Sequence, residues 1–182
     1  MKTQEIKESL LKFECPNWKQ LPDFELYMDQ VLYFLNDRLR ILYFDDEKDI
    51  ITSNMINNYV KNSIVHPPVR KHYKQYHLAF LIVVTILKRC FSLHEISQLI
   101  EIQDALVSDT IEKAYDGFSS CFNHYLHEIL TYGHVENEWT FKHKTNEKEL
   151  MVRVVKTIVY KILAELDILE YEEKKGPIES ID

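Results

Sequence analysis

Glycine is scarce in this chain of 182 residues, which contains only Gly117, Gly133 and Gly176. Loops that cradle phosphates and fingerprints that bind dinucleotides need closely spaced glycines, so both kinds of site are excluded. No serine or cysteine stands in a recognised nucleophile motif, and no two carboxylates are paired in a catalytic pattern. We therefore expect that the protein is not an enzyme and that it needs no cofactor.

Acidic residues are missing from residues 50–94, although the whole chain has 29 of them and a formal net charge of −7. The same window holds six basic side chains, Lys61, Arg70, Lys71, Lys74, Lys88 and Arg89. A buried segment that avoids charge would explain the apolar run Leu78–Leu87 but not six bases without an acid. This asymmetry indicates a polyanionic partner.

Cysteine is rare, and a signal peptide and a long apolar run are both missing. Cys15, Cys90 and Cys121 are odd in number and show no paired spacing, which is typical of reduced thiols inside a cell. The longest apolar run, Leu78–Leu87, is too short to span a bilayer, and the N-terminus lacks an apolar core. We expect a cytoplasmic protein with no membrane partner.

Helical periodicity dominates what is present. Apolar residues recur at helical spacing at about 23–39, 52–61, 75–90, 92–103, 115–129 and 150–166. Asp23 is the expected cap of the first of these helices, and Thr52 or Ser53 the expected cap of the second. Ser92 and Glu95 form a capping box. An acidic loop, Asp45–Asp49, separates the first two helices.

The helix at 52–61 has two different faces. Met55, Ile56, Tyr59 and Val60 are spaced to be buried together, whereas Asn54, Asn57, Asn58 and Lys61 form one polar stripe. Asparagine is a mediocre helix former, so three on one stripe need a further reason. One reason is that a side-chain amide can pair with the adenine edge in a DNA major groove. The alternative is an ordinary solvated helix face.

A helix, a turn, a polar-faced second helix, a basic turn and a third helix follow in the order of a winged helix-turn-helix unit. The expected DNA contacts are Ser53, Asn54, Asn57, Asn58, Lys61, Arg70, Lys71, His72, Tyr73 and Lys74. The helix at 53–61 is expected to read the DNA sequence, and residues 69–75 are expected to form a basic wing, in which Tyr73 either packs the wing onto the domain or binds a phosphate. Lys88 and Arg89 either cap a helix or contact DNA. The acidic loop must point away from the DNA.

Several motifs in this region resemble the N-terminal domain of MerR-type transcriptional regulators. They are Met55–Lys61, Ile64-Val65 with Pro67-Pro68, Arg70–Tyr73, His77–Leu87, and Phe91–Ile96. Leu21-Pro22-Asp23, Leu26–Val31 and the Met55–Lys61 run are more closely similar to the bacterial family called domain of unknown function 1836, which is regarded as DNA-binding. The resemblance covers about residues 18–102. This chain differs from the MerR pattern at Asn58, Val60 and Ser63, where that pattern has Tyr, Glu and Gly.

The resemblance implies an all-α, mainly helical protein with a MerR-like winged helix-turn-helix. We divide the chain into an N-terminal lead-in (1–20), the winged helix-turn-helix domain (21–103) and a helical C-terminal region for dimerisation or effector binding (104–182). The predicted function is that of a transcriptional regulator which binds double-stranded DNA as a homodimer. The alternative is an adaptor that keeps the fold and binds another protein.

The C-terminal region suggests two further roles. An aromatic stripe, Tyr115, Phe118, Phe122 and Tyr125, could line a pocket for a small-molecule effector, although such stripes are usually packing. The amphipathic helix Leu150–Leu166 is the candidate for dimerisation. Cys121, His124 and His127 lie three residues apart, a spacing that converges poorly on one ion, so no metal site is expected.

Overall fold

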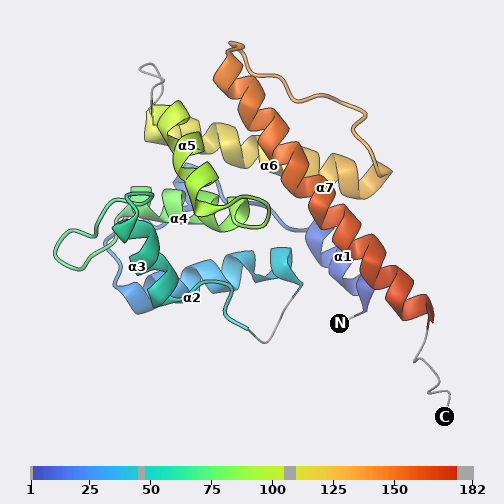
Figure 1. The fold of residues 1–182 in the computed structure, drawn as a ribbon, viewed down its shortest axis with the longest axis horizontal. Coiled ribbons are helices and arrows are strands. Elements are labelled where there is room, and N and C mark those ends of the chain that lie inside the picture. The colour runs from blue at the N-terminus through green and yellow to red at the C-terminus, as the bar shows by residue number, and fades with distance from the viewer. Residues whose placement is uncertain (1, 45–47, 105–109, 176–182) are drawn as a thin grey trace.

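The chain folds into helices joined by loops, of which residues 62–74 and 133–145 form two long ones (Figure 1). The computed structural model describes residues 2–44, 48–104 and 110–175. The α-helices are α1 (Thr3–Leu11), α2 (Met28–Leu39), α3 (Ser53–Lys61), α4 (Gln75–Leu87), α5 (Leu93–Asp104), α6 (Ile111–Tyr132) and α7 (Asn146–Lys175), with short 3-10 turns η1 (Trp18–Gln20) and η2 (Arg40–Tyr43). Within these residues there are isolated β-bridges but no strand, so the all-α class is confirmed.

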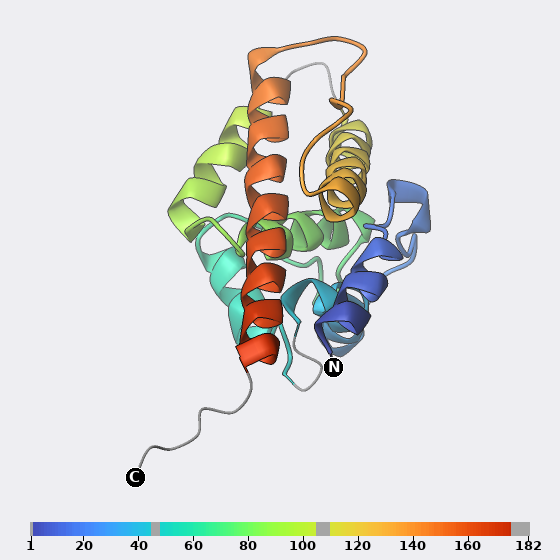
Figure 2. The same ribbon diagram turned by 90° about the vertical axis from the view of Figure 1, so that its right-hand side faces the viewer.

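The long helix α7 runs across the molecule and packs against α6 and α1 (Figures 1 and 2). The N-terminus lies near the end of α7, where the Thr3 amide donates to the Glu173 carboxylate at 2.8 Å. The lead-in therefore contains a packed helix. None of the described helices is both long and apolar enough to cross a membrane.

The apolar stripe of α7 is buried inside the chain, which corrects the prediction that Leu150–Leu166 pairs two protomers. Its inward side chains are almost fully covered, at 7% exposure or less, and they are Val154, Val155, Ile158, Val159, Ile162 and Leu166. The stripe completes the core by packing on α6 and α1, because a chain of this size needs that surface internally. A dimer must use another face.

Helix α2 begins at Met28, so the predicted cap at Asp23 is wrong. The residues before it are extended, because Leu26 forms two backbone hydrogen bonds with Tyr73, at 2.9 and 2.8 Å. Phe24, which helical spacing would bury, is 61% exposed. This backbone pairing with a distant segment overrides the local periodicity. Of the acidic loop, Asp45–Glu47 lie outside the described residues, and Asp49 pairs with Arg40 at 3.6 Å.

Arg89 joins the two halves of the molecule. Its side chain is 4% exposed, pairs with Glu165 of α7 and donates to the Leu42 carbonyl. The guanidinium also lies over the rings of Tyr43 and Phe44, at 4.8 and 5.4 Å from their centroids. Arg89 therefore neither caps a helix nor contacts DNA. A buried charge that is paired and hydrogen-bonded in this way ties α4 and η2 to α7.

Asn36, in the middle of α2, fixes the approach to α3. Its amide nitrogen donates to the carbonyls of Leu32 and Ile51, at 2.9 and 3.0 Å. Its amide oxygen accepts from the N–H groups of Ile50 and Ile51, at 2.8 and 3.2 Å. The side chain is 5% exposed, so these backbone groups have little access to water. One amide thus satisfies the residues that lead directly into the cap of α3.

We expect Asn36→Ala to lower the free energy of unfolding by about 2–4 kcal/mol, because it leaves the buried N–H and C=O of Ile51 and the half-buried N–H of Ile50 without a partner. The matched control is Asn62→Ala, which removes hydrogen bonds at an exposed site and should cost less than about 0.5 kcal/mol. Urea denaturation followed by circular dichroism measures both. Equal losses for the two variants would contradict the role assigned to Asn36.

Candidate nucleic-acid interface

Helix α3 has the two faces that its sequence predicts. Ile56 and Tyr59 are buried, at 0% and 2% exposure, whereas Asn54, Asn57 and Lys61 are exposed. The Thr52 hydroxyl accepts from the Met55 amide at 3.4 Å, which confirms the predicted cap. The apolar face holds α3 on the core, so the polar stripe points to solvent.

The three asparagines of the stripe are not equivalent. The Asn62 amide donates to the side-chain oxygen of Asn58 at 3.0 Å and to the Asn58 carbonyl at 2.8 Å. Asn54 and Asn57 make no side-chain hydrogen bond with any described residue. Both of their amides are therefore available to a ligand, while the Asn58 oxygen is already engaged. Ser53, at the start of the stripe, is half-buried.

Helix α3 ends in a Schellman motif, which turns the chain toward the basic segment. The Ile64 amide donates to the Tyr59 carbonyl at 2.9 Å, and the Ser63 amide to the Val60 carbonyl at 3.0 Å. Ser63 has a φ of 57°, the left-handed conformation that glycine adopts most easily. The MerR pattern has glycine at this position. Ser63 adopts the backbone conformation that favours glycine, although the residue is a serine.

The basic segment after α3 closes in a tight turn at Val69–His72 (Figure 1). Val69 and His72 exchange two backbone hydrogen bonds, at 3.0 and 2.9 Å. Between them Arg70 and Lys71 have φ values of 51° and 68°. Two positive φ angles in a row define the kind of two-residue turn that normally selects asparagine and glycine. Two long basic side chains are held instead at the tip of the turn, and both are exposed.

Tyr73 anchors this turn and does not face solvent. Its side chain is 2% exposed, and its backbone pairs with Leu26. Burial also raises the pKa of its hydroxyl. Of the two predicted roles, packing the wing onto the domain is confirmed and contact with phosphate is wrong.

His77 closes the base of the same segment, and the sequence analysis missed it. The Lys74 amide donates to His77 Nδ1 at 2.8 Å, so Nε2 carries the proton that faces the Pro67 carbonyl at 3.2 Å. The ring is fully buried, and burial lowers its pKa. A neutral histidine therefore links the two ends of the loop. The sequence showed it only as the polar residue that begins the resembling run His77–Leu87, with no sign of what its ring would bind.

Fewer of the six basic side chains in residues 50–94 contribute free positive charge to the surface than the sequence suggests. The Glu25 carboxylate lies 3.8 Å from the Lys74 ammonium and 4.0 Å from His72 Nδ1. Arg89 is buried, as described above. Lys88 is half-buried at the C-cap of α4. Lys61, Arg70 and Lys71 remain as exposed cations, and neither they nor Lys88 form an ion pair with the residues that the structure describes. The neutralising role of Glu25 was not predicted, because it depends on the extended pairing of Leu26 with Tyr73.

The predicted effector stripe divides into two parts. Tyr115 and Phe118 line a cavity between helices, whereas Phe122 and Tyr125 are fully buried core residues outside its lining, which corrects their assignment. The Tyr115 hydroxyl donates to the Pro16 carbonyl and the Tyr125 hydroxyl to Glu138, both at 2.7 Å. Among the described side chains, no cluster of three or more His, Cys, Asp or Glu could hold a metal ion.

These observations define an all-α protein with an exposed polar helix face on α3 and, a short loop further along the chain, an exposed basic turn at Val69–His72. The chain belongs to the family described as domain of unknown function (DUF1836), whose model matches residues 16–118, more than half of its length. The matched region includes α3 and the basic turn but not α7. The resemblance to this family is thus confirmed, whereas the MerR likeness stays a prediction. No match was found among curated proteins or among solved structures.

The double variant Arg70→Asn, Lys71→Gly should stabilise the protein, because it places residues suited to left-handed geometry in the turn. Relief of strain at two positions should raise the free energy of unfolding by roughly 1–2 kcal/mol and the melting temperature by a few degrees. Ser63→Gly is the matched control, since it relieves the same backbone conformation at one position without removing a charge. Thermal denaturation followed by circular dichroism measures the melting temperature of both variants. A lower melting temperature for the double variant than for the native chain would contradict the claim that the turn is strained.

Proposed function

We propose that the protein is a transcriptional regulator that binds double-stranded DNA in the cytoplasm, with a MerR-like arrangement of α2, α3 and the basic turn. The observation that carries the proposal is the strained turn at Arg70 and Lys71. Non-glycine residues in the left-handed region cluster at functional sites, where the strain is retained for what the side chains do. Two exposed cations at the tip of a turn suit phosphate oxygens.

Helix α3 supplies the part that reads sequence. Its free amides, Asn54 and Asn57, lie one turn apart on the exposed face, and each offers the donor and acceptor that match the adenine edge. Lys61 follows on the same stripe and suits a phosphate or a guanine. Asn58, whose oxygen is engaged by Asn62, is assigned a supporting role. Asn57 is therefore the residue that we expect to carry most of the base preference.

Variants of Asn57 and Lys71 should affect DNA binding differently. Asn57→Ala should cost about 1–3 kcal/mol on the preferred site and relax the preference at one base pair. Lys71→Ala should weaken all sequences alike and reduce the slope of log K against log salt by roughly one unit. Fluorescence anisotropy with DNA from the upstream region of the gene, titrated over a range of salt concentrations, measures both quantities.

Two controls make this experiment decisive. Ser63→Gly relieves backbone strain without removing a charge, so it should leave the DNA affinity unchanged. The double variant Arg70→Asn, Lys71→Gly should make the protein more stable and weaken its binding to DNA. The assignment of α3 as the reading helix fails if Asn57→Ala and Asn54→Ala both keep full discrimination between sequences. Binding that does not depend on salt would remove the role of the basic turn.

An adaptor that binds another protein is the second candidate, because apolar side chains surround the turn. Phe24, Tyr27 and Val69 are 61%, 55% and 45% exposed, and the Tyr27 ring lies 4.5 Å from that of His72. Clustered exposed apolar groups are typical of protein interfaces. Salt separates the two candidates, since an apolar interface is barely weakened between low and moderate salt.

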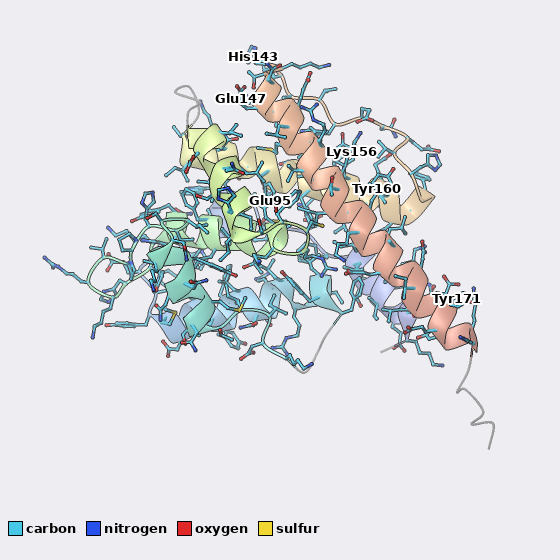
Figure 3. The ribbon with its side chains drawn as sticks, in the orientation of Figure 1. Glu95, His143, Glu147, Lys156, Tyr160 and Tyr171 are labelled. Carbon is cyan, nitrogen blue, oxygen red and sulfur yellow. The ribbon has the colours of Figure 1, made fainter. Side chains whose placement is uncertain are left out.

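We further propose a homodimer formed through the outer face of α7. Tyr160, Ala164, Ile168 and Tyr171 recur at helical spacing and are exposed. Figure 3 labels Tyr160 and Tyr171 along α7. Ile168 and Tyr171 are 57% and 70% exposed, which is unusual for large apolar side chains on one stripe. A two-fold axis at Ala164 places Lys161, which pairs with Glu165 of its own helix at 2.8 Å, opposite Asp167 of the other copy, so that unlike charges face each other across the axis.

Sedimentation equilibrium should give a dimer for the native chain and a monomer for Ile168→Glu, because the substitution places a charge in an apolar contact. Thr131→Glu, an exposed substitution on α6, is the control and should leave the dimer intact. A native chain that stays monomeric at concentrations of tens of micromolar would rule out this interface.

A further inference from the structure

A cavity of about 190 Å³ lies where α4, α5, α6 and α7 meet. Its walls are mainly apolar and include Phe80, Val83, Leu99, Phe118, Leu150 and Met151. The cavity therefore has one wall from α4 and α5, which follow the basic turn, and another from α7, which the family match does not cover. The cavity is partly open to solvent, because Ile102 and Ile111 of its lining are 39% and 45% exposed, so a small molecule has a way in.

The size and the lining restrict what the cavity can hold. A dry apolar cavity of roughly 150 Å³ is known to accept benzene. A cavity slightly larger than that suits one aromatic ring or a fused pair of small rings. Water is a poor occupant, because it needs two to four polar partners and most of these walls offer none.

The polar groups of the lining come from the same end of the molecule. Gln103, near the end of α5, makes no side-chain hydrogen bond with the described residues and is half-buried. Glu147 lies near the start of α7, at the end of that helix shown at the top of Figure 3. A hydrogen bond from its own backbone N–H, followed by one from Thr145, lowers the pKa of the Glu147 carboxyl. A negative charge is thus fixed at this end of the cavity.

We propose that this cavity is a binding site for a small neutral aromatic molecule of one or two rings that carries a single hydrogen-bonding group. The ring occupies the apolar space between Phe80, Phe118 and Leu150, and the polar group meets the free amide of Gln103. Glu147 repels anions, so aromatic carboxylates should bind more weakly than neutral rings of the same size. The site goes beyond the proposed DNA binding and does not depend on it.

Indole and indole-3-carboxylate test the proposal, because they share a ring system and differ in charge. Each is titrated into the full-length native chain, with binding followed by ligand-observed NMR and by the melting temperature. Indole should bind and raise the melting temperature as its concentration increases, since it binds only the folded state. Indole-3-carboxylate should bind roughly tenfold more weakly or worse.

Two substitutions locate the site. Ala114→Phe places a ring inside the cavity and should abolish indole binding, whereas Ser120→Phe adds the same ring at an exposed position of α6 and should not. Val83→Phe fills the cavity from α4 and serves if Ala114→Phe does not fold. Glu147→Gln should leave indole affinity unchanged and raise the affinity for indole-3-carboxylate toward that of indole.

Each outcome bears on the site alone. Indole binding that is lost in Ala114→Phe or Val83→Phe and kept in Ser120→Phe supports it. No saturable indole binding by the native chain overturns it, as does binding that survives both cavity-filling variants. Equal affinity for the two probes overturns the role of Glu147. None of these results depends on whether the chain binds DNA, so the two proposals can fail separately.

Discussion

The amide of Asn36 is the constraint on which the proposed DNA-binding surface depends. Helix α3 is only nine residues long and could not hold its orientation through local structure alone. Asn36 satisfies the backbone of Ile50 and Ile51 immediately before the Thr52 cap, and Ile51 itself is fully buried. Asn36 fixes where α3 begins, and the buried Ile56 and Tyr59 then turn the stripe of Asn54, Asn57 and Lys61 outward.

The basic turn that follows α3 places charged side chains at positions where other residues would make the fold more stable. Arg70 and Lys71 occupy backbone positions that asparagine and glycine would fill at lower free energy. The turn persists because its base is fixed by Tyr73, which packs in the core, and by His77, which bridges Pro67 and Lys74. A rigid base thus holds a strained tip. Such strain is expected where side chains, here those of Arg70 and Lys71, must be held in place for a binding partner.

Features set by neighbouring residues could be predicted from the sequence. The two-faced helix α3, its cap at Thr52 and the capping box of Ser92 and Glu95 all depend on spacing within one or two helical turns. The all-α class follows from the same periodicity.

Features set by distant partners could not be predicted. Arg89 looks like a helix cap until Glu165, 76 residues later, is seen beside it. The stripe of α7 is equally suited to a partner chain or to α6, and only the packed structure shows that it is used internally. The extended segment before α2 depends on Tyr73, and Glu25 reaches the basic turn only through that pairing. The spacing of apolar residues predicts which face of a helix is buried, but it does not identify the segment that packs on that face.

The central claim is that α3 and the basic turn bind DNA and that Asn57 reads a base. Sequencing the fragments that the purified full-length chain retains from sheared genomic DNA tests it most directly. The account predicts an enriched motif that contains a fixed A·T pair, and it predicts that Asn57→Ala retains DNA with that pair no longer fixed. Recovery of fragments without any shared motif, or of no DNA even at low salt, would contradict it.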